Sequence, residues 1–304
     1  MPNGNNWRLG LPLTLGAALM WATLPIMLKG LLTDMSPATS AFFRFLVAGV
    51  VLFAILNARK QPNTLVKLKN PRLLLATLFA GVMLSGNYLF FAWGVEYITP
   101  SASQVLIQLA PMMLLFGSIL LFREPFTKRQ WLGCLIFAGG LLLFFHHRLA
   151  QLISDPGDYA LGILFMVIAA VTWAIYALAQ KRILRDLEAQ QLNLMIFLIG
   201  SLCLLPFADP LDMDISTGQW LLLILCGANT LVAYACFTAA LHHWQATKVS
   251  ATLTLVPILT LMVIPVSLAI WPDLFQPEQL ELANYLGACM VVLGSLTVVT
   301  AKAR

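Results

Sequence analysis

The sequence predicts an all-α membrane protein whose ten transmembrane helices form two inverted repeats of five helices, with both termini in the cytoplasm. Three observations predict this fold class. The 304-residue chain is 60% hydrophobic and only 10% charged, with a mean hydropathy of +0.85, whereas a soluble domain of this length needs far more charge on its surface. Its apolar residues fall into ten stretches, each long enough to cross a bilayer core about 30 Å thick. Landmarks of the first half also return in the second half.

The ten apolar stretches occupy most of the chain and leave no room for a soluble domain. In order, they cover residues 9–31, 38–58, 73–97, 101–122, 130–146, 159–180, 190–208, 217–243, 247–270 and 283–301. The first five form a predicted unit over residues 1–148, and the last five form a second unit over residues 159–304. Because five crossings are an odd number, the second unit enters the membrane from the opposite side and is inverted relative to the first.

The distribution of basic residues sets the predicted orientation. With ten crossings, fifteen of the eighteen Lys and Arg residues fall on the side of the two termini, and only Lys29 and Arg148 fall opposite. Ten of the thirteen acidic residues fall on the side that is poor in Lys and Arg. The positive-inside rule therefore predicts a multi-pass protein of the inner or plasma membrane with both termini cytoplasmic. The net charge of +5 thus reflects topology, and we expect no nucleic-acid partner.

The sequence carries no pattern of catalytic or metal-binding residues. The five cysteines lie in predicted helices without metal-ligand spacing. There is no phosphate-binding loop, nucleophile elbow or HExxH pattern. We therefore expect a protein that is not an enzyme and uses no cofactor or metal. The histidine pairs at 146–147 and 242–243 lie at span ends, where we interpret them as interfacial residues rather than metal ligands.

Two polar stripes carry the strongest functional signal. Each has four residues at spacings of 3, 4 and 3, which places them on one face of a helix. The first stripe and its counterpart 146 residues later are Ser101, Gln104, Gln108 and Pro111, and Thr247, Ser250, Thr254 and Pro257. Polar groups that face lipid are costly, so both stripes are expected to face protein or water. One interpretation is a solute pathway near the midplane between the two units, and the other is hydrogen bonding between helices.

We assign two roles to residues along the predicted pathway. The candidates for substrate binding are amide, hydroxyl, aromatic and cationic side chains, namely Trp21, Arg44, Asn87, Tyr88, Gln104, Gln108, Trp173, Tyr176, Tyr234 and Thr254. The candidates for hinges are Pro111 and Pro257, because each removes a backbone donor and frees a carbonyl in mid-membrane. Amides can bind a polar solute without the cost of a buried charge. Aromatic side chains deep in a helix either line a cavity or pack the bundle.

Arg44 is the charged residue that lies well inside a predicted span. Three interpretations are open from the sequence. It binds an anionic group of a substrate, it pairs with Glu96 at the end of the third span, or it reaches the outer headgroups. The matching position of the second unit is Ile196, so Arg44 would give the pathway an asymmetric charge.

Glycines recur in the fifth and tenth predicted spans, where they allow helices to approach closely. They are Gly133, Gly139, Gly140, Gly287 and Gly294. We expect these two spans to be peripheral packing helices, with a dimer contact as an open alternative. The protein is accordingly expected to be a monomer or a homodimer in a lipid bilayer.

Several of these features together resemble a known family. They are Trp21, the run around Arg44, the run from Ser101 through Pro111 to residue 127, the spacing from Gly133 to Gly140, and a second-half counterpart from Lys248 through Pro257 to Gly294. The chain resembles the drug/metabolite transporter superfamily, specifically its ten-helix EamA-type permeases. The resemblance covers nearly the whole chain. One departure is a segment between Pro257 and Gly287 that is eight residues longer than the one between Pro111 and Gly133 (30 − 22).

The resemblance implies a secondary carrier that exports amino acids or other small metabolites through a central cavity by alternating access. Relatives of the same fold exchange sugar phosphates or nucleotide sugars, but those cavities pair cations, whereas Arg44 stands alone in this sequence. Two further alternatives are a non-transporting membrane scaffold and a passive channel. The polar stripes disfavour the scaffold, and saturable flux stimulated by counterflow would exclude the channel.

Overall fold

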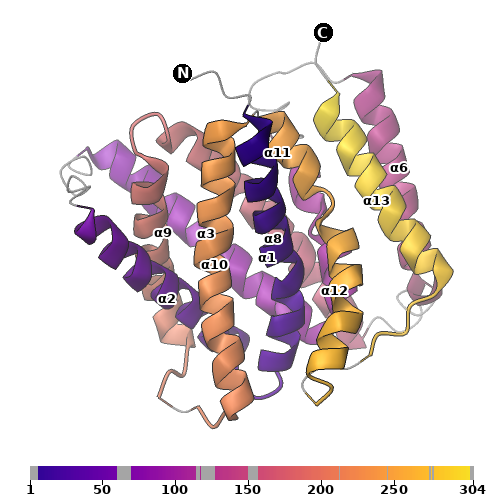
Figure 1. Cartoon of the computed structure of the whole chain (residues 1–304), viewed down its shortest axis with the longest axis horizontal. Helices are drawn as coiled ribbons and strands as arrows, with labels where there is room; N and C mark the ends of the chain where they lie inside the picture. The colour runs from indigo at the N-terminus through magenta and orange to yellow at the C-terminus, as the bar shows by residue number, and fades with distance from the viewer. Residues whose placement is uncertain are drawn as a thin grey trace.

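The computed structural model describes residues 6–59, 70–113, 117, 127–149, 157–211, 213–244, 246–273, 275 and 277–301, and all regular structure in these ranges is helical. The helices are α1 Trp7–Leu31, α2 Pro37–Ala58, α3 Pro71–Tyr97, α4 Pro100–Leu106, α6 Lys128–Phe144, α8 Gly157–Ile183, α9 Ala189–Leu204, η2 Leu205–Phe207, α10 Thr217–His243, α11 Ala246–Leu253, α12 Val256–Ile270 and α13 Leu282–Thr300. Figure 1 shows them as one bundle.

Eight segments within the described ranges are long and apolar enough to cross a membrane. They are α1, α2, α3, α8, α9 with η2, α10, the continuous stretch from α11 to α12, and α13. This confirms the prediction of a helical chain with several membrane spans. Two of the ten predicted spans are not among the eight. The span predicted over residues 101–122 lies partly outside the described residues. The span predicted over residues 130–146 corresponds to α6, whose 17 residues make it slightly shorter than the eight segments above.

Local sequence signals explain where several helices begin. Ser36 precedes Pro37, and its hydroxyl accepts a hydrogen bond from the N–H of Thr39. Thr127 and Ser216 begin α6 and α10 with reciprocal caps, in which a glutamine three residues later also bonds back to the cap. Such caps satisfy N–H groups that a helix leaves unpaired at its first turn.

The main helix pairs join the two halves of the chain. The most extensive packing is between α6 and α13, α3 and α8, α1 and α10, and α2 and α9. In the α1–α10 pair, the first helix of the first half packs on the third helix of the second half, and in the α8–α3 pair the first helix of the second half packs on the third helix of the first half. The α2–α9 pair joins the two second helices, and the α6–α13 pair joins the two last helices. The pairing is therefore symmetric with respect to the two predicted units.

Glycine brings α6 and α13 into backbone contact at one edge of the bundle (Figure 1). A Cβ atom added at Gly287 would lie 2.5 Å from the backbone nitrogen of Phe144, and one added at Gly294 would lie 2.5 Å from the backbone nitrogen of Phe137. Gly133 and Gly140 face them with equally little space. Four of the five predicted packing glycines are thus used in a contact within the chain.

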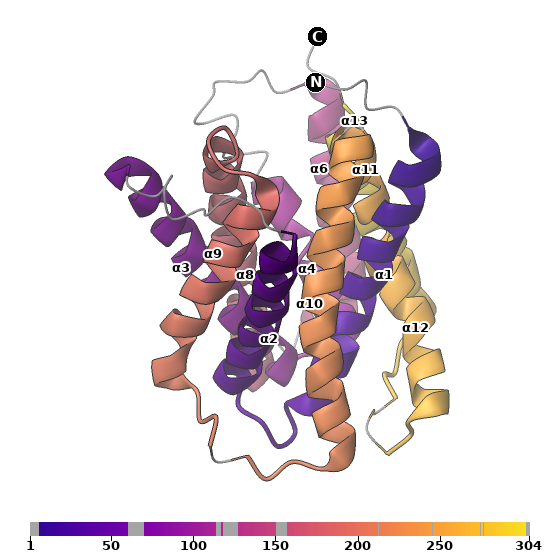
Figure 2. The same ribbon diagram turned by 60° about the vertical axis from the view of Figure 1, so that its left-hand side comes forward.

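Figures 1 and 2 place both chain termini at one end of the bundle and the α9–α10 connection, which carries Asp209 and Asp214, at the opposite end. The end of α2, which Arg59 follows, and the beginning of α3, which carries Arg72, point toward the end of the bundle with the termini (Figures 1 and 2). At these four positions, the basic and the acidic residues lie toward opposite ends of the bundle.

Candidate functional site

A cavity of about 410 Å³ lies between the two halves of the bundle. Its wall is made by residues from α1, α2, α3, α4, α6, α8, α10, α11, α12 and α13. Ten of the twelve predicted site residues line it, namely Trp21, Arg44, Asn87, Tyr88, Gln104, Gln108, Pro111, Trp173, Tyr234 and Thr254. The structure thus brings together side chains that are spread over more than 230 positions of the sequence (254 − 21 = 233).

Arg44 lines the cavity and is 2% exposed. Its guanidinium carbon lies 4.2 Å from the centroid of the Tyr88 ring, and its Nε donates to the hydroxyl of Thr230 at 3.3 Å. Its Nη1 is buried and has no hydrogen-bond partner among the described residues. A buried guanidinium is costly unless its donors are satisfied, and an anion in the cavity would supply the missing acceptor.

The position of Arg44 disfavours two of the three interpretations that the sequence left open. A side chain with 2% exposure does not reach the headgroup region. Glu96 is exposed, and the cation near it is Lys29, whose Nζ donates to the Glu96 carbonyl oxygen at 2.7 Å. The predicted alternative of an Arg44–Glu96 pair is therefore wrong, because α1 rather than α2 brings its cation to the end of α3.

The amides of the cavity divide into two groups. Asn87 and Gln104 each donate to a backbone carbonyl of another helix, Ala169 at 2.8 Å and Trp21 at 2.7 Å. These two side chains therefore connect helices, as one of the sequence interpretations proposed. Gln108 lines the cavity and makes no hydrogen bond to another described residue, so its donors and acceptor remain available to a solute.

Aromatic rings form one side of the cavity. Trp21 contacts Tyr234 edge to face, with ring centroids 5.9 Å apart, and Phe237 at 5.5 Å. Tyr88 lies beneath Arg44 and packs on Phe45 at 4.3 Å. These rings present apolar surface with a few polar edges, as is common in small-molecule sites.

Both helices that carry the polar stripes are interrupted beside the cavity. The first breaks at Ile107 and Gln108, after α4, and the second breaks at Thr254 and Leu255, between α11 and α12. Proline cannot donate a hydrogen bond, so Pro257 leaves the carbonyl of Leu253 without its usual helical donor. The corresponding carbonyl of Ile107 instead accepts from the N–H of Ala110 at 2.9 Å.

Two predicted site residues do not line the cavity. Tyr176 is fully buried in a hydrophobic cluster that includes Phe45 and Phe197, one turn beyond the cavity-lining Trp173. Pro257 is buried beside the helix break, next to the lining residue Val256. The side chain of Thr247, the first residue of the second stripe, lies outside the described part of the chain.

Sequence reasoning missed several side chains of the site. Thr230 is the hydrogen-bond partner of Arg44, and Phe237 and Gln130 line the cavity. Thr230 lies four residues before Tyr234, and Phe237 lies three residues after it. All three residues therefore share one face of α10. That spacing was the available signal, since Tyr234 was already a candidate for substrate binding.

The cavity extends toward the end of the bundle that carries the termini, where Gln130 of α6 and Val299 and Ala301 near the chain end line it. Polar contacts tie the helices together at the opposite end. Lys29 donates to the carbonyls of Val95, Glu96 and Ile98 at 2.9, 2.7 and 3.1 Å.

Glu278, on the segment between α12 and α13, adds a second contact at this opposite end. Its carboxylate accepts from the backbone N–H of Ser101 at 3.2 Å and from the Ser101 hydroxyl. Burial raises the pKa of the Glu278 carboxyl, and the hydrogen bonds from Ser101 and the nearby Lys29 offset this in part.

We expect Glu278→Gln to raise the melting temperature in mildly alkaline buffer. A carboxyl whose folded-state pKa is raised stabilises the fold fully below its unfolded pKa and loses that contribution as pH rises through the folded pKa. The glutamine removes the buried charge, so the difference from wild type should vanish in acid, below the ordinary carboxyl pKa of about 4.3. Thermal unfolding of both proteins across pH measures this. Asp273→Asn, an exposed carboxylate on the same segment, is the control; a difference that grows on acidification would contradict the expectation.

Comparisons with known proteins agree with the helical membrane fold. The chain is 37% identical over 289 residues to the uncharacterized inner membrane transporter YhbE of Escherichia coli K12, covering 95% of this chain and 90% of YhbE. It is 33% identical to an uncharacterized transporter of Haemophilus influenzae, covering 95% and 94%. A solved crystal structure shares the fold with a TM-score of 0.67 at 19% identity, over 97% of this chain and 98% of that one.

The sequence pattern of the EamA-like transporter family matches the chain twice, over residues 8–146 and 160–300. Together these matches account for nearly all of the described helices. The resemblance inferred from Trp21, Arg44 and the proline-containing stripes is confirmed. This chain is a membrane transporter that belongs to the EamA-like transporter family.

Proposed function

We propose that this protein is a secondary transporter that exports small metabolites with a carboxylate group, amino acids among them, across the inner membrane by alternating access. The observation that carries the proposal is Arg44, whose Nη1 is buried beside the cavity without a partner among the described residues. A carboxylate would accept two parallel hydrogen bonds from such a guanidinium. The uncharged amide of Gln108 and the rings of Trp21 and Tyr234 suit the rest of a small zwitterion or acid.

The charge of the cavity favours a carboxylate over a phosphate ester. Arg44 is the one cation among the described lining residues. A phosphate dianion needs more than one neutralising group at membrane depth, so the exchange of sugar phosphates is the weaker candidate.

The architecture suits alternating access. We infer two inverted units, approximately residues 1–148 and 159–304, because the helix pairs map onto each other when the halves are exchanged. With both termini in the cytoplasm, the cavity extends toward the cytoplasmic side, and the contacts of Lys29 and Glu278 hold the other side together. Such an arrangement would load substrate from the cytoplasm, as an exporter must. Pro111 and Pro257 are the proposed hinges, since both lie beside helix breaks at the cavity.

Efflux from proteoliposomes tests the proposal. Vesicles that contain the protein and labelled amino acids or other carboxylates should lose label faster than empty vesicles, with saturation and with stimulation by unlabelled substrate outside. Stimulation by counterflow separates a carrier from a channel. Equal loss from both kinds of vesicle for every carboxylate would refute the proposal.

The two glutamines of the first stripe should respond differently to substitution. Gln108→Leu should raise KM about tenfold without lowering the melting temperature, because the side chain binds solute rather than protein. Gln104→Leu should lower the melting temperature, because it removes the hydrogen bond to the Trp21 carbonyl and leaves that acceptor unpaired. Transport assays and thermal unfolding of the two variants measure the contrast. If both substitutions stabilise the protein and leave its function intact, the scaffold alternative gains support.

A further inference from the structure

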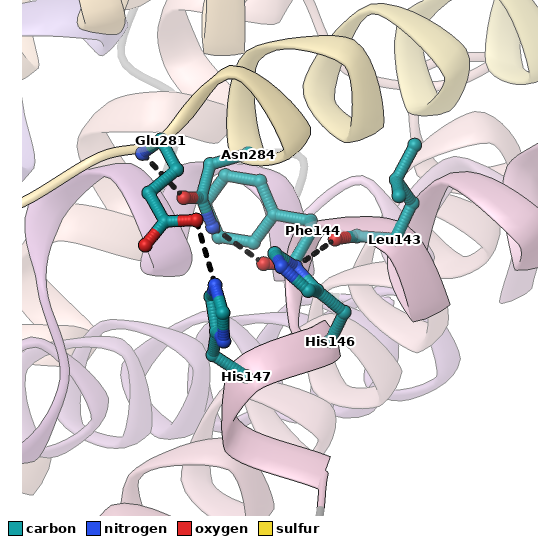
Figure 3. Close-up of polar contacts among 6 residues, drawn as sticks. All are labelled: Leu143, Phe144, His146, His147, Glu281 and Asn284. Atoms are coloured by element: carbon teal, nitrogen blue, oxygen red, sulfur yellow. Dashed lines mark hydrogen bonds and ion pairs between the residues drawn. The ribbon is translucent and has the colours of Figure 1, made fainter.

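A second group of side chains that could bind a ligand lies away from the cavity, where α6 and α13 meet (Figure 3). His146 and His147 follow the end of α6, and Glu281 precedes the first residue of α13. His147 Nε2 lies 2.7 Å from Glu281 Oε2, and the two imidazole rings lie 3.8 Å apart between centroids. One potential ligand atom from each of the three residues lies within 4.8 Å of the other two.

His146 is oriented as a metal ligand would be. Its Nδ1 lies 2.8 Å from the carbonyl oxygen of Leu143. Because a carbonyl can only accept, Nδ1 must carry the proton, and Nε2 of the neutral ring keeps its lone pair. A ligating histidine usually donates its other ring nitrogen to a carbonyl or carboxylate in this way, which fixes both its tautomer and its orientation.

Glu281 is anchored to the helix end that carries the histidines. Its N–H donates to Oδ1 of Asn284 at 2.8 Å, and Nδ2 of Asn284 donates to the carbonyl of Phe144 at 2.6 Å. Figure 3 shows these contacts as a short chain from α13 to α6, beside the His147–Glu281 pair. The backbone of Glu281 and Nδ1 of His146 are thus held by contacts that leave Nε2 of His146 unused.

We propose that His146, His147 and Glu281 bind a divalent transition-metal ion, with Zn²⁺ as the representative. Two imidazole nitrogens and one carboxylate oxygen suit Zn²⁺, at about 2.0–2.2 Å from the metal, with water in the remaining position. Mg²⁺ and Ca²⁺ prefer oxygen ligands and would bind weakly. The side chains of His147 and Glu281 are 62% and 64% exposed, so they can close the remaining separation around an ion that arrives from solvent.

The ion would join the last helices of the two halves. Because α6 and α13 are already in backbone contact through their glycines, metal binding should stabilise an existing pair rather than move it. Gln130, the cavity residue of α6, lies 14 residues before Phe144, which is about 21 Å along a helix. We therefore expect the metal to raise the melting temperature of the protein without occupying the substrate cavity.

Zinc titration of the purified, full-length protein with its affinity tag removed tests the site. Calorimetry after treatment with a chelator should show one Zn²⁺ per chain, Mg²⁺ should give no comparable heat, and Zn²⁺ should raise the melting temperature. His147→Gln and Glu281→Gln should each weaken zinc binding about tenfold or more. These are exposed side chains, so the variants should fold as wild type does.

The other histidine pair supplies the matched control, since the chain has four histidines, of which the remaining two are His242 and His243. His243→Gln should keep the wild-type affinity for zinc. The proposal is overturned if wild type binds no Zn²⁺, if binding survives both His147→Gln and Glu281→Gln, or if His243→Gln abolishes it. None of these measurements uses transport, so they are independent of the proposed substrate.

Discussion

Arg44→Ala is expected to reduce the transport of carboxylate substrates by about 30-fold or more. The Arg44 guanidinium is the one positive charge among the described residues that line the cavity, and its Nη1 has no hydrogen-bond partner among the described residues. Removing one partner of a desolvated, hydrogen-bonded charge pair costs about 2 kcal/mol or more, which is the free-energy equivalent of this factor. The initial rate of efflux from proteoliposomes, measured against substrate concentration, gives the change in kcat/KM.

The comparison between an amino acid and its amide makes this test specific. Wild type should prefer the acid, and Arg44→Ala should lose that preference, because only the carboxylate engages the guanidinium fully. Arg44→Lys should keep the positive charge but not the two parallel hydrogen bonds, so its rate of transport of the acid should lie between the rates of wild type and Arg44→Ala.

An arginine outside the cavity controls for charge and packing. Arg148 also lies over a tyrosine ring, Tyr159 at 4.9 Å, but does not line the cavity. Arg148→Ala should therefore leave transport unchanged. If Arg44→Ala lowers the transport of acid and amide equally, Arg44 has a structural role, and the proposed recognition of a carboxylate is wrong.

The sequence predicted the helices well because a membrane span is determined mainly by the hydropathy of a long stretch of residues. A lipid-exposed backbone must form its own hydrogen bonds, so a long apolar stretch has little choice but to be helical. The predicted stretch 38–58 became α2 Pro37–Ala58, and 283–301 became α13 Leu282–Thr300. Caps account for the small differences, since Pro37 is acceptable in the first turn and Ser36 caps it.

The sequence predicted ten of the 22 described residues that line the cavity, for a different reason. The stripe that contains Gln104 and Gln108 has one polar face in an apolar helix, and its repetition 146 residues later marked the same face in the other half. Tyr176 shows the limit of this reasoning. It lies three residues after Trp173 and on the same face of α8, but one turn further along the helix this face packs in the core.

Contacts between distant residues could not be predicted from one sequence. Thr230 meets Arg44 across 186 positions, and Glu278 meets Ser101 across 177. The His146–His147 pair was interpreted as interfacial because nothing in the sequence places Glu281 beside it, 134 positions after His147. Each of these pairs depends on which helices pack together, and hydropathy does not determine that.

Gly140→Ala is expected to destabilise the protein by about 1–3 kcal/mol, the usual cost of overpacking a close contact. The new Cβ would lie 2.6 Å from the backbone nitrogen of Val291 and 2.8 Å from the carbonyl oxygen of Gly287. Backbone atoms of α13 cannot turn aside as a side chain can, so the whole α6–α13 pair would have to separate. Thermal unfolding in detergent should show a lower melting temperature.

The neighbouring glycine is the matched control for this change. A Cβ added at Gly139 would meet only the mobile end of a side chain, the Met290 methyl group at 3.3 Å. Gly139→Ala adds the same atoms to the same helix and replaces glycine with a better helix former, so its melting temperature should equal or exceed that of wild type. Equal losses in the two variants would mean that α6 and α13 do not meet along the face of Gly140. A loss in Gly140→Ala alone would show that backbone contact between the two halves sets the spacing of this pair.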